Sequence, residues 1–162
     1  MFDIQSVVFR HSSMYGTNQR ATIDQGWIGW FIKKALEIKN GDVKDRFSIC
    51  GNGKQVRDVL NSNDVVSLYF TATKNINLIS GNVFNIGGGY SNSLSLIELF
   101  KMIEGILSIE MKYNILPARK SDQLVFIADN TKITNLIGWT PNISIFDGIN
   151  KAIEWSINYT SN

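Results

Sequence analysis

Cysteine and histidine are almost missing from this sequence of 162 residues, with one of each. Cys50 alone cannot form an internal disulfide, and together with His11 it supplies too few ligands for an ordinary structural zinc site. Because Cys50 lies in an apolar run, we expect a buried and inert thiol, which fits a reducing compartment. No metal site is therefore expected.

Long apolar runs and an excess of charge are also absent. No run reaches membrane-spanning length, and residues 1–4 lack the basic start of a signal peptide, so a cytoplasmic location is expected. The net charge of +2 is too small to indicate nucleic acid or a membrane as partner, so any anion site must be local. With 44% hydrophobic and 19% charged residues, the chain is expected to fold as a single domain over residues 1–162.

One stretch, residues 51–60, organises the rest of the chain. Gly51 and Gly53 flank Asn52 in a tight turn, and a short strand follows. Arg57 comes directly after this turn, where its planar guanidinium is well placed to hold two phosphate oxygens. Asp58 beside it could orient the guanidinium or pair with the next helix. The alternative interpretation is a surface hairpin with one exposed ion pair.

Further strands and helices follow from the hydrophobic pattern. Residues 6–10 read as a buried parallel strand, and residues 11–16 as a loop at its carboxyl end, where open α/β sheets bind ligands. A lone histidine such as His11 is more often a packed polar residue than a catalyst. Other strands are expected at residues 47–50, 82–86 and 111–116, and helices from about 26 to 40, after Asn61 or Asn63, from Ser93 or Ser95, from Asp129 to Leu136, and over 145–155. Asp24 or Gln25 is the expected cap of the first helix.

Aromatic and glycine residues offer weaker signals. Trp27 and Trp30 recur at helical spacing, which fits either core packing or one wall of a binding cleft. Residues 87–89 are three glycines between a strand and a helix, as in a phosphate cradle, but they lack the spacing of a dinucleotide or P-loop motif.

A second polar cluster at residues 118–123 contains Arg119. Pro117, two residues earlier, restricts the backbone that leads to Arg119. Arg57 and Arg119 could hold a diphosphate from two sides, and the alternative is a solvated loop.

Taken together, four runs resemble the C-terminal half of the extended short-chain dehydrogenase/reductases, the NAD-dependent nucleotide-sugar epimerases and dehydratases. They are residues 10–16 (RHSSMYG), 51–58 (GNGKQVRD), 84–88 (FNIGG), and Asp129 with 138–141 (GWTP). Residues 24–31 (DQGWIGWF) are similar to members of the family that act on CDP-linked sugars.

The resemblance implies an α/β fold: the C-terminal substrate-binding part of an extended Rossmann-type fold, with mixed short strands and helices. This part begins with one strand of the parent sheet, and the N-terminal nucleotide-binding core is absent. The family binds NAD through a glycine motif and catalyses with a Tyr-x-x-x-Lys pair, and neither is found here. The chain therefore resembles a fragment, a split gene product or a shortened substrate half, and carries no catalytic residue.

The resemblance also implies roles for residues of the two polar clusters. Arg57 matches a diphosphate contact, and Arg119 a second phosphate or ribose contact. Asp122 and Gln123 lie beside Arg119 in the implied substrate site.

Roles near the first loop are implied in the same way. Ser13 takes the position where relatives often have a sugar-contacting Asn, and Gln25 and Trp27 would line the nucleotide side of the cleft. His11 and Ser12 would approach the nicotinamide end of NAD.

The implied function is that of the substrate half of an epimerase that oxidises and re-reduces its sugar through transient NADH. The expected partners are a nucleotide diphosphate sugar, CDP-linked by preference, and the missing NAD-binding half. The alternative is a non-catalytic module that binds a nucleotide or another protein. An unpaired strand edge in the isolated chain predicts self-association into a homo-oligomer.

Overall fold

The computed structural model describes residues 3–20, 22–42 and 46–160. In chain order, its elements are β1 (Val8–His11), β2 (Ser13–Tyr15), α1 (Trp27–Lys39), β3 (Phe47–Cys50), β4 (Val56–Asn61), α2 (Ser62–Lys74), α3 (Ile76–Ile79), β5 (Val83–Ile86), the 3-10 helix η1 (Tyr90–Asn92), β6 (Ser93–Ser95), α4 (Leu96–Leu107), β7 (Tyr113–Leu116), β8 (Val125–Phe126), α5 (Thr131–Ile137) and α6 (Ile145–Thr160). This mixture of parallel strands and helices confirms the expected α/β fold.

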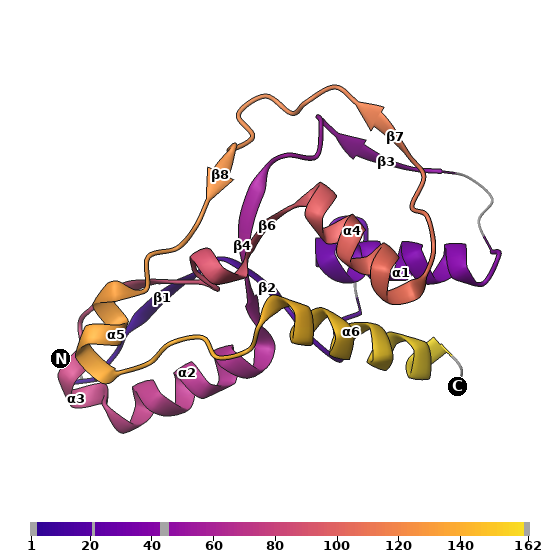
Figure 1. Ribbon diagram of the computed structural model, residues 1–162. Helices are drawn as coiled ribbons and strands as arrows, with labels where there is room; N and C mark the ends of the chain where they lie inside the picture. Colours follow the sequence, from indigo (N-terminus) through magenta and orange to yellow (C-terminus); the bar gives the residue numbers. More distant parts are fainter. Residues whose placement is uncertain (1–2, 21, 43–45, 161–162) are drawn as a thin grey trace.

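The helices form two groups, with β4 between them (Figure 1). Helices α2, α3 and α5 gather near β1, whereas α1, α4 and α6 lie at the other end of the molecule with β3 and β7 above them. Strand β4 pairs with β2 and β8 in parallel and with β6 in antiparallel orientation. It therefore connects the two groups.

The first strand is parallel, as the sequence predicted, but starts two residues later. β1 pairs with β5 from Val8↔Val83 to His11↔Ile86. The chain then changes partner: Ser12 N donates to Ile86 O at 2.8 Å, and the next residues pair with β4 as β2. The loop expected at residues 11–16 is therefore wrong for His11, which ends β1, and for residues 13–15, which form β2.

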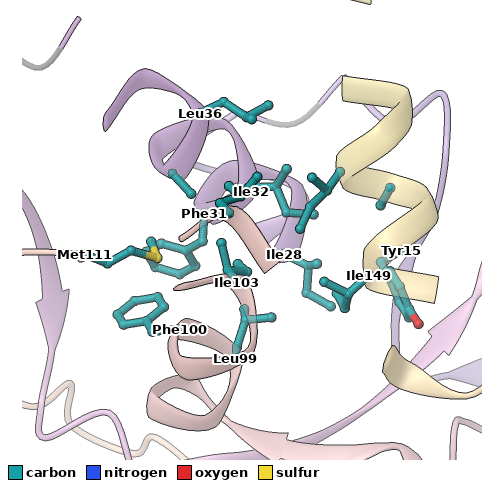
Figure 2. Close-up of a cluster of buried hydrophobic side chains, with 14 of the residues drawn as sticks. Tyr15, Ile28, Phe31, Ile32, Leu36, Leu99, Phe100, Ile103, Met111 and Ile149 are labelled. Carbon is teal, nitrogen blue, oxygen red and sulfur yellow. The ribbon is translucent and has the colours of Figure 1, made fainter. Parts of the chain in front are cut away.

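Each helix group encloses its own hydrophobic core. Helix α1 buries Ile28, Phe31 and Ile32 against α4 and α6, as helical spacing requires (Figure 2). Phe31 and Phe100 meet edge to face, with ring centroids 4.8 Å apart. Each fully buried side chain of this size contributes about 2 kcal/mol to stability through burial. Helices α1, α4 and α6 are therefore held together by their shared core.

A smaller core lies under α2, α3 and α5. It is built from Leu60, Leu68, Ile79, Phe84 and Ile133, all at most 1% exposed. This core holds β4 and β5 in place from the opposite end of the molecule.

Helix starts were predicted with mixed success. The expected cap of α1 by Asp24 or Gln25 is wrong, because Gly26 (φ 75°) precedes the helix without a side-chain cap. Ser95 does start α4, in a capping box with Glu98, and Asn61 Oδ1 accepts from Asn63 N at 3.0 Å at the start of α2.

The last two helices differ from expectation in detail. Helix α5 has Asn130 as its N-cap, and Asp129 Oδ1 accepts from Thr131 N at 2.9 Å instead. Gly138 (φ 70°) ends α5 in the left-handed conformation, as predicted. Helix α6 continues to Thr160, past the predicted end at residue 155.

Candidate functional site

A cleft of about 810 Å³ opens between the start of α1, strand β3 and the segment that follows β7. This volume is typical of small-molecule sites. All but one of the residues that the sequence assigned to substrate binding line it: Ser13, Gln25, Trp27, Arg57, Arg119 and Asp122. The structure therefore brings together side chains from segments far apart in the chain.

Arg57 reaches the cleft from β4. Its Nη1 donates to Val56 O at 2.8 Å, and its Nη2 to Asp122 Oδ1, also at 2.8 Å. The Arg57 and Asp122 side chains are 23% and 31% exposed, so the pair is only partly screened by water. These two contacts hold the guanidinium in one orientation at the edge of the cleft.

Asp122 is fixed from a second side by Gln55. Gln55 Nε2 donates to Asp122 Oδ2 at 3.1 Å and to Cys50 O at 3.2 Å. The expected role of Asp58 as the partner of Arg57 is therefore wrong, because Asp122 takes it. The alternative surface hairpin is also wrong, since β3 pairs with β7 and not with β4.

Asp58 is buried on the other side of β4. Its side chain is fully buried, and Oδ2 accepts from Gly89 N at 3.1 Å and Ala128 N at 3.2 Å. Burial raises the pKa of Asp58, and the hydrogen bonds from Gly89 and Ala128 oppose that rise. Asp58 Oδ1 has no hydrogen-bond partner among the described residues.

The glycine run packs against this carboxylate. A Cβ on Gly87 would collide with Asp58 Oδ2, and one on Gly88 with Val59 O. Gly87 and Gly88 thus allow the β5 end to approach β4 closely. The interpretation of residues 87–89 as a phosphate cradle is wrong, because Asp58 of this chain occupies the space.

Arg119 lines the same cleft from the segment that follows β7. Its side chain is exposed. No ion pair of Arg119 is found among the described residues, so its charge is available to an incoming anion. The two arginines face one cleft, as the diphosphate hypothesis requires.

Trp27 and Trp30 satisfy both interpretations. Each is half-buried and packs against the core of α1, α4 and α6, and each also lines the cleft. Their exposed ring surface offers apolar area for stacking a planar group.

Sequence reasoning missed two further cations of the cleft. Lys34 Nζ lies 4.7 Å from the Trp30 ring centroid and 2.7 Å from Glu37 Oε2, and Arg46 is exposed just before β3. The i, i+4 spacing of Trp30 and Lys34 was a signal that could have identified Lys34. Cys50 is half-buried in the cleft wall, so the expectation of a buried thiol is wrong.

His11 and Ser12, the residues expected near NAD, are not among the residues that line the cleft. His11 Nε2 is 3.3 Å from Tyr69 Oη, and the two rings stack. Burial lowers the pKa of His11, and Ser12 lies beside Asp58 and Gly87. Gln123 is exposed and does not line the cleft. A role for these residues stays a prediction.

The described part of the chain contains neither a membrane-spanning helix nor a candidate metal site. None of its helices is long and apolar enough to cross a membrane. Its His, Cys, Asp and Glu residues form no group of three or more that could hold a metal ion.

Comparison with known proteins places this chain in a family. Residues 1–87 match the NAD dependent epimerase/dehydratase family, and the chain belongs to this family. This finding confirms the resemblance drawn from the sequence runs.

Particular members are similar along nearly the whole chain. The CDP-paratose 2-epimerase of Salmonella typhi is 58% identical over 156 residues, which cover 96% of this chain and 46% of that protein. The UDP-glucuronate 4-epimerase of Thermodesulfobacterium geofontis is 28% identical, covering 96% of this chain and 44% of that protein. The chain spans about half the length of the curated relatives it matches.

Solved structures agree on the fold. The UDP-glucose 4-epimerase of Thermotoga maritima, solved with UDP-glucose, matches with a TM-score of 0.83 and 27% identity, over 97% of this chain and 47% of that one. The UDP-glucuronic acid 4-epimerase of Bacillus cereus, solved with UDP-glucuronic acid and NAD, matches with a TM-score of 0.80 and 25% identity, over 94% and 45%.

Proposed function

We propose that this chain is the substrate-binding half of an NAD-dependent nucleotide-sugar epimerase. The observation that carries the proposal is the convergence of Arg57 and Arg119, 62 residues apart in the numbering, on one cleft. Two guanidinium groups in a partly apolar cleft are suited to a diphosphate, because each can donate two parallel hydrogen bonds. Family membership supports this assignment.

The preferred substrate is a CDP-linked sugar epimerised at C2. The 58% identity to a CDP-paratose 2-epimerase supports it, and relatives that act on UDP-linked sugars are less similar. Trp27 and Trp30 offer flat apolar surface to the nucleoside, and Ser13 a hydroxyl to the sugar. Contacts to the nucleotide would position the reacting carbon of the sugar, although the residues that make these contacts do not touch that carbon.

NAD, when bound, would supply the group that accepts a hydride from the sugar and donates it back. The glycine run of this chain does not fit its phosphates, because Asp58 fills that space. We propose that the dinucleotide is held mainly by the other half of the family's fold, and that His11 and Ser12 approach its nicotinamide end.

Exposed apolar residues at one end of the molecule support the proposal that another part of the protein packs there. Val8 and Val83 on the β1–β5 pair are 52% and 40% exposed, and Val66 and Phe70 on α2 are 52% and 67% exposed. Among the described residues, β1 pairs only with β5. We propose that the NAD-binding half covers this surface.

Calorimetry of the chain with CDP, UDP, dTDP and NAD tests the proposal. CDP should bind most tightly, and NAD should not bind. Tight NAD binding in the absence of CDP binding would overturn the assignment, and binding of none of the nucleotides would favour an interaction module.

A further inference from the structure

The Arg57 guanidinium already holds an anion that this chain supplies. Arg57 Nη2 lies 2.8 Å from Asp122 Oδ1, and Gln55 holds the second oxygen of the same carboxylate. A carboxylate and a phosphate present similar acceptor oxygens to a guanidinium. Asp122 therefore occupies Arg57 Nη2, the donor that the proposed function assigns to a ligand phosphate. This inference rests on that proposed function.

Asp122 and Arg119 belong to one turn. Asp122 N donates to Arg119 O at 3.3 Å, and Ser121 between them has φ 67°, which residues other than glycine rarely adopt. A displacement of the Asp122 backbone would therefore shift Arg119 as well.

The segment that carries this turn is anchored at its two ends. Gly51 N donates to Leu116 O and Val56 N donates to Leu124 O, both at 2.9 Å. Between the anchors the side chains are exposed, and the Asp122 contacts tie the segment to the cleft. The turn can thus move while its ends remain in register.

We infer that Asp122 is an internal competitor for the diphosphate site and acts as a latch. When no anion is bound, Asp122 neutralises Arg57. An arriving pyrophosphate or nucleoside diphosphate exchanges with the carboxylate on Arg57, and the released turn brings Arg119 onto the second phosphate. The measured affinity is then the intrinsic affinity reduced by the fraction of molecules in which the latch is open.

Asp122→Asn tests the latch, since it keeps the shape of the side chain and removes its charge. Titration calorimetry with inorganic pyrophosphate and with CDP at low salt should give a dissociation constant about threefold to tenfold lower than in the unaltered chain. Glu110→Gln is the matched control. It removes the same charge from an exposed pair with Lys112 (3.1 Å) outside the cleft lining, and should change the dissociation constant less than about twofold.

A second measurement needs no ligand. Trypsin cleaves after Arg119 and Lys120, whose side chains are already exposed. Cleavage also needs a backbone that can adapt to the protease, and an open latch frees the backbone of this turn. Cleavage there should be at least about threefold faster in Asp122→Asn than in the unaltered chain and in Glu110→Gln.

The outcomes separate the latch from the function on which it rests. Equal or weaker binding by Asp122→Asn, with binding lost in Arg57→Ala, overturns the latch and leaves Arg57 as the phosphate contact. Unchanged binding by Arg57→Ala overturns the phosphate site, and the latch with it. If neither the unaltered chain nor Asp122→Asn binds either probe, both are overturned.

Discussion

Replacing the buried carboxylate of Asp58 with an amide or a methyl group separates its charge from its hydrogen bonds. Asp58 Oδ2 accepts from Gly89 N and Ala128 N, and so ties β4 to the β5–η1 loop and to the segment before α5. In Asp58→Asn the amide oxygen can still accept from both N–H groups. In Asp58→Ala both donors lose their partner.

The two substitutions should differ widely in stability at pH 7. Each buried N–H left without a partner costs about 1–3 kcal/mol, so Asp58→Ala should lose about 2–4 kcal/mol of unfolding free energy, allowing for partial access of water. Asp58→Asn keeps the bonds in weaker, neutral form but removes a charge that is costly to bury, and should lie within about 1 kcal/mol of the unaltered protein.

The pH dependence gives an independent check of the sign. Burial raises the pKa of Asp58 above the ordinary value of 3.8 in the folded state. The folded state therefore binds its proton more readily than the unfolded state, and the stability linked to Asp58 falls as pH rises through the folded pKa. Relative to Asp58→Asn, the unaltered protein should gain stability as pH is lowered from 7 toward 4.

Urea unfolding followed by tryptophan fluorescence at several pH values measures both effects. Asp129→Asn is the control with the opposite sign, because hydrogen bonds from Thr131 lower the pKa of the exposed Asp129, so its contribution is lost as pH falls. The reasoning is refuted if Asp58→Asn is as damaging as Asp58→Ala, or if the unaltered protein loses stability relative to Asp58→Asn on acidification.

Other residues give shorter tests. Arg57→Ala should weaken CDP binding by about 1.5–3 kcal/mol in calorimetry, the contribution of a hydrogen bond to a charged group, and an unchanged dissociation constant would remove Arg57 from the site. Gly87→Ala should destabilise the fold by about 1–3 kcal/mol in urea, since its Cβ would collide with Asp58 and the Ala128 side chain; normal stability would contradict this close packing. Ser121→Gly should raise stability by about 0.5 kcal/mol in thermal unfolding, because glycine adopts the left-handed conformation without strain. Light scattering of the isolated chain should detect dimers or larger species, and a monomer at all concentrations would count against an exposed sheet edge.

The sequence predicted which residues line the cleft better than it predicted which side chains pair with one another. Arg57 was recognised because a glycine turn and a strand are local features. Its partner Asp122 lies 65 positions away, and no local pattern links the two. The neighbour Asp58 was the wrong choice for a reason visible in advance, since successive residues of a strand point to opposite faces.

Short elements were missed where long-range pairing creates them. Residues 13–15 are too few to show a strand pattern by themselves, yet they form β2 because β4 offers an adjacent edge. Likewise, Gly26 starts α1 without a capping side chain, and its left-handed conformation is set by the turn that precedes the helix. Longer helices such as α4 were predicted because their pattern repeats over several turns.

The alternation along β4 couples binding to folding. Arg57 faces the cleft, and Asp58, the next residue, holds two loops on the other face. A change that loosens those loops will also displace the strand that carries Arg57. Weaker CDP binding by Asp58→Ala would therefore not make Asp58 a ligand contact. Asp58→Asn distinguishes the two explanations: if it folds normally and binds CDP normally, Asp58 positions Arg57 only through the strand.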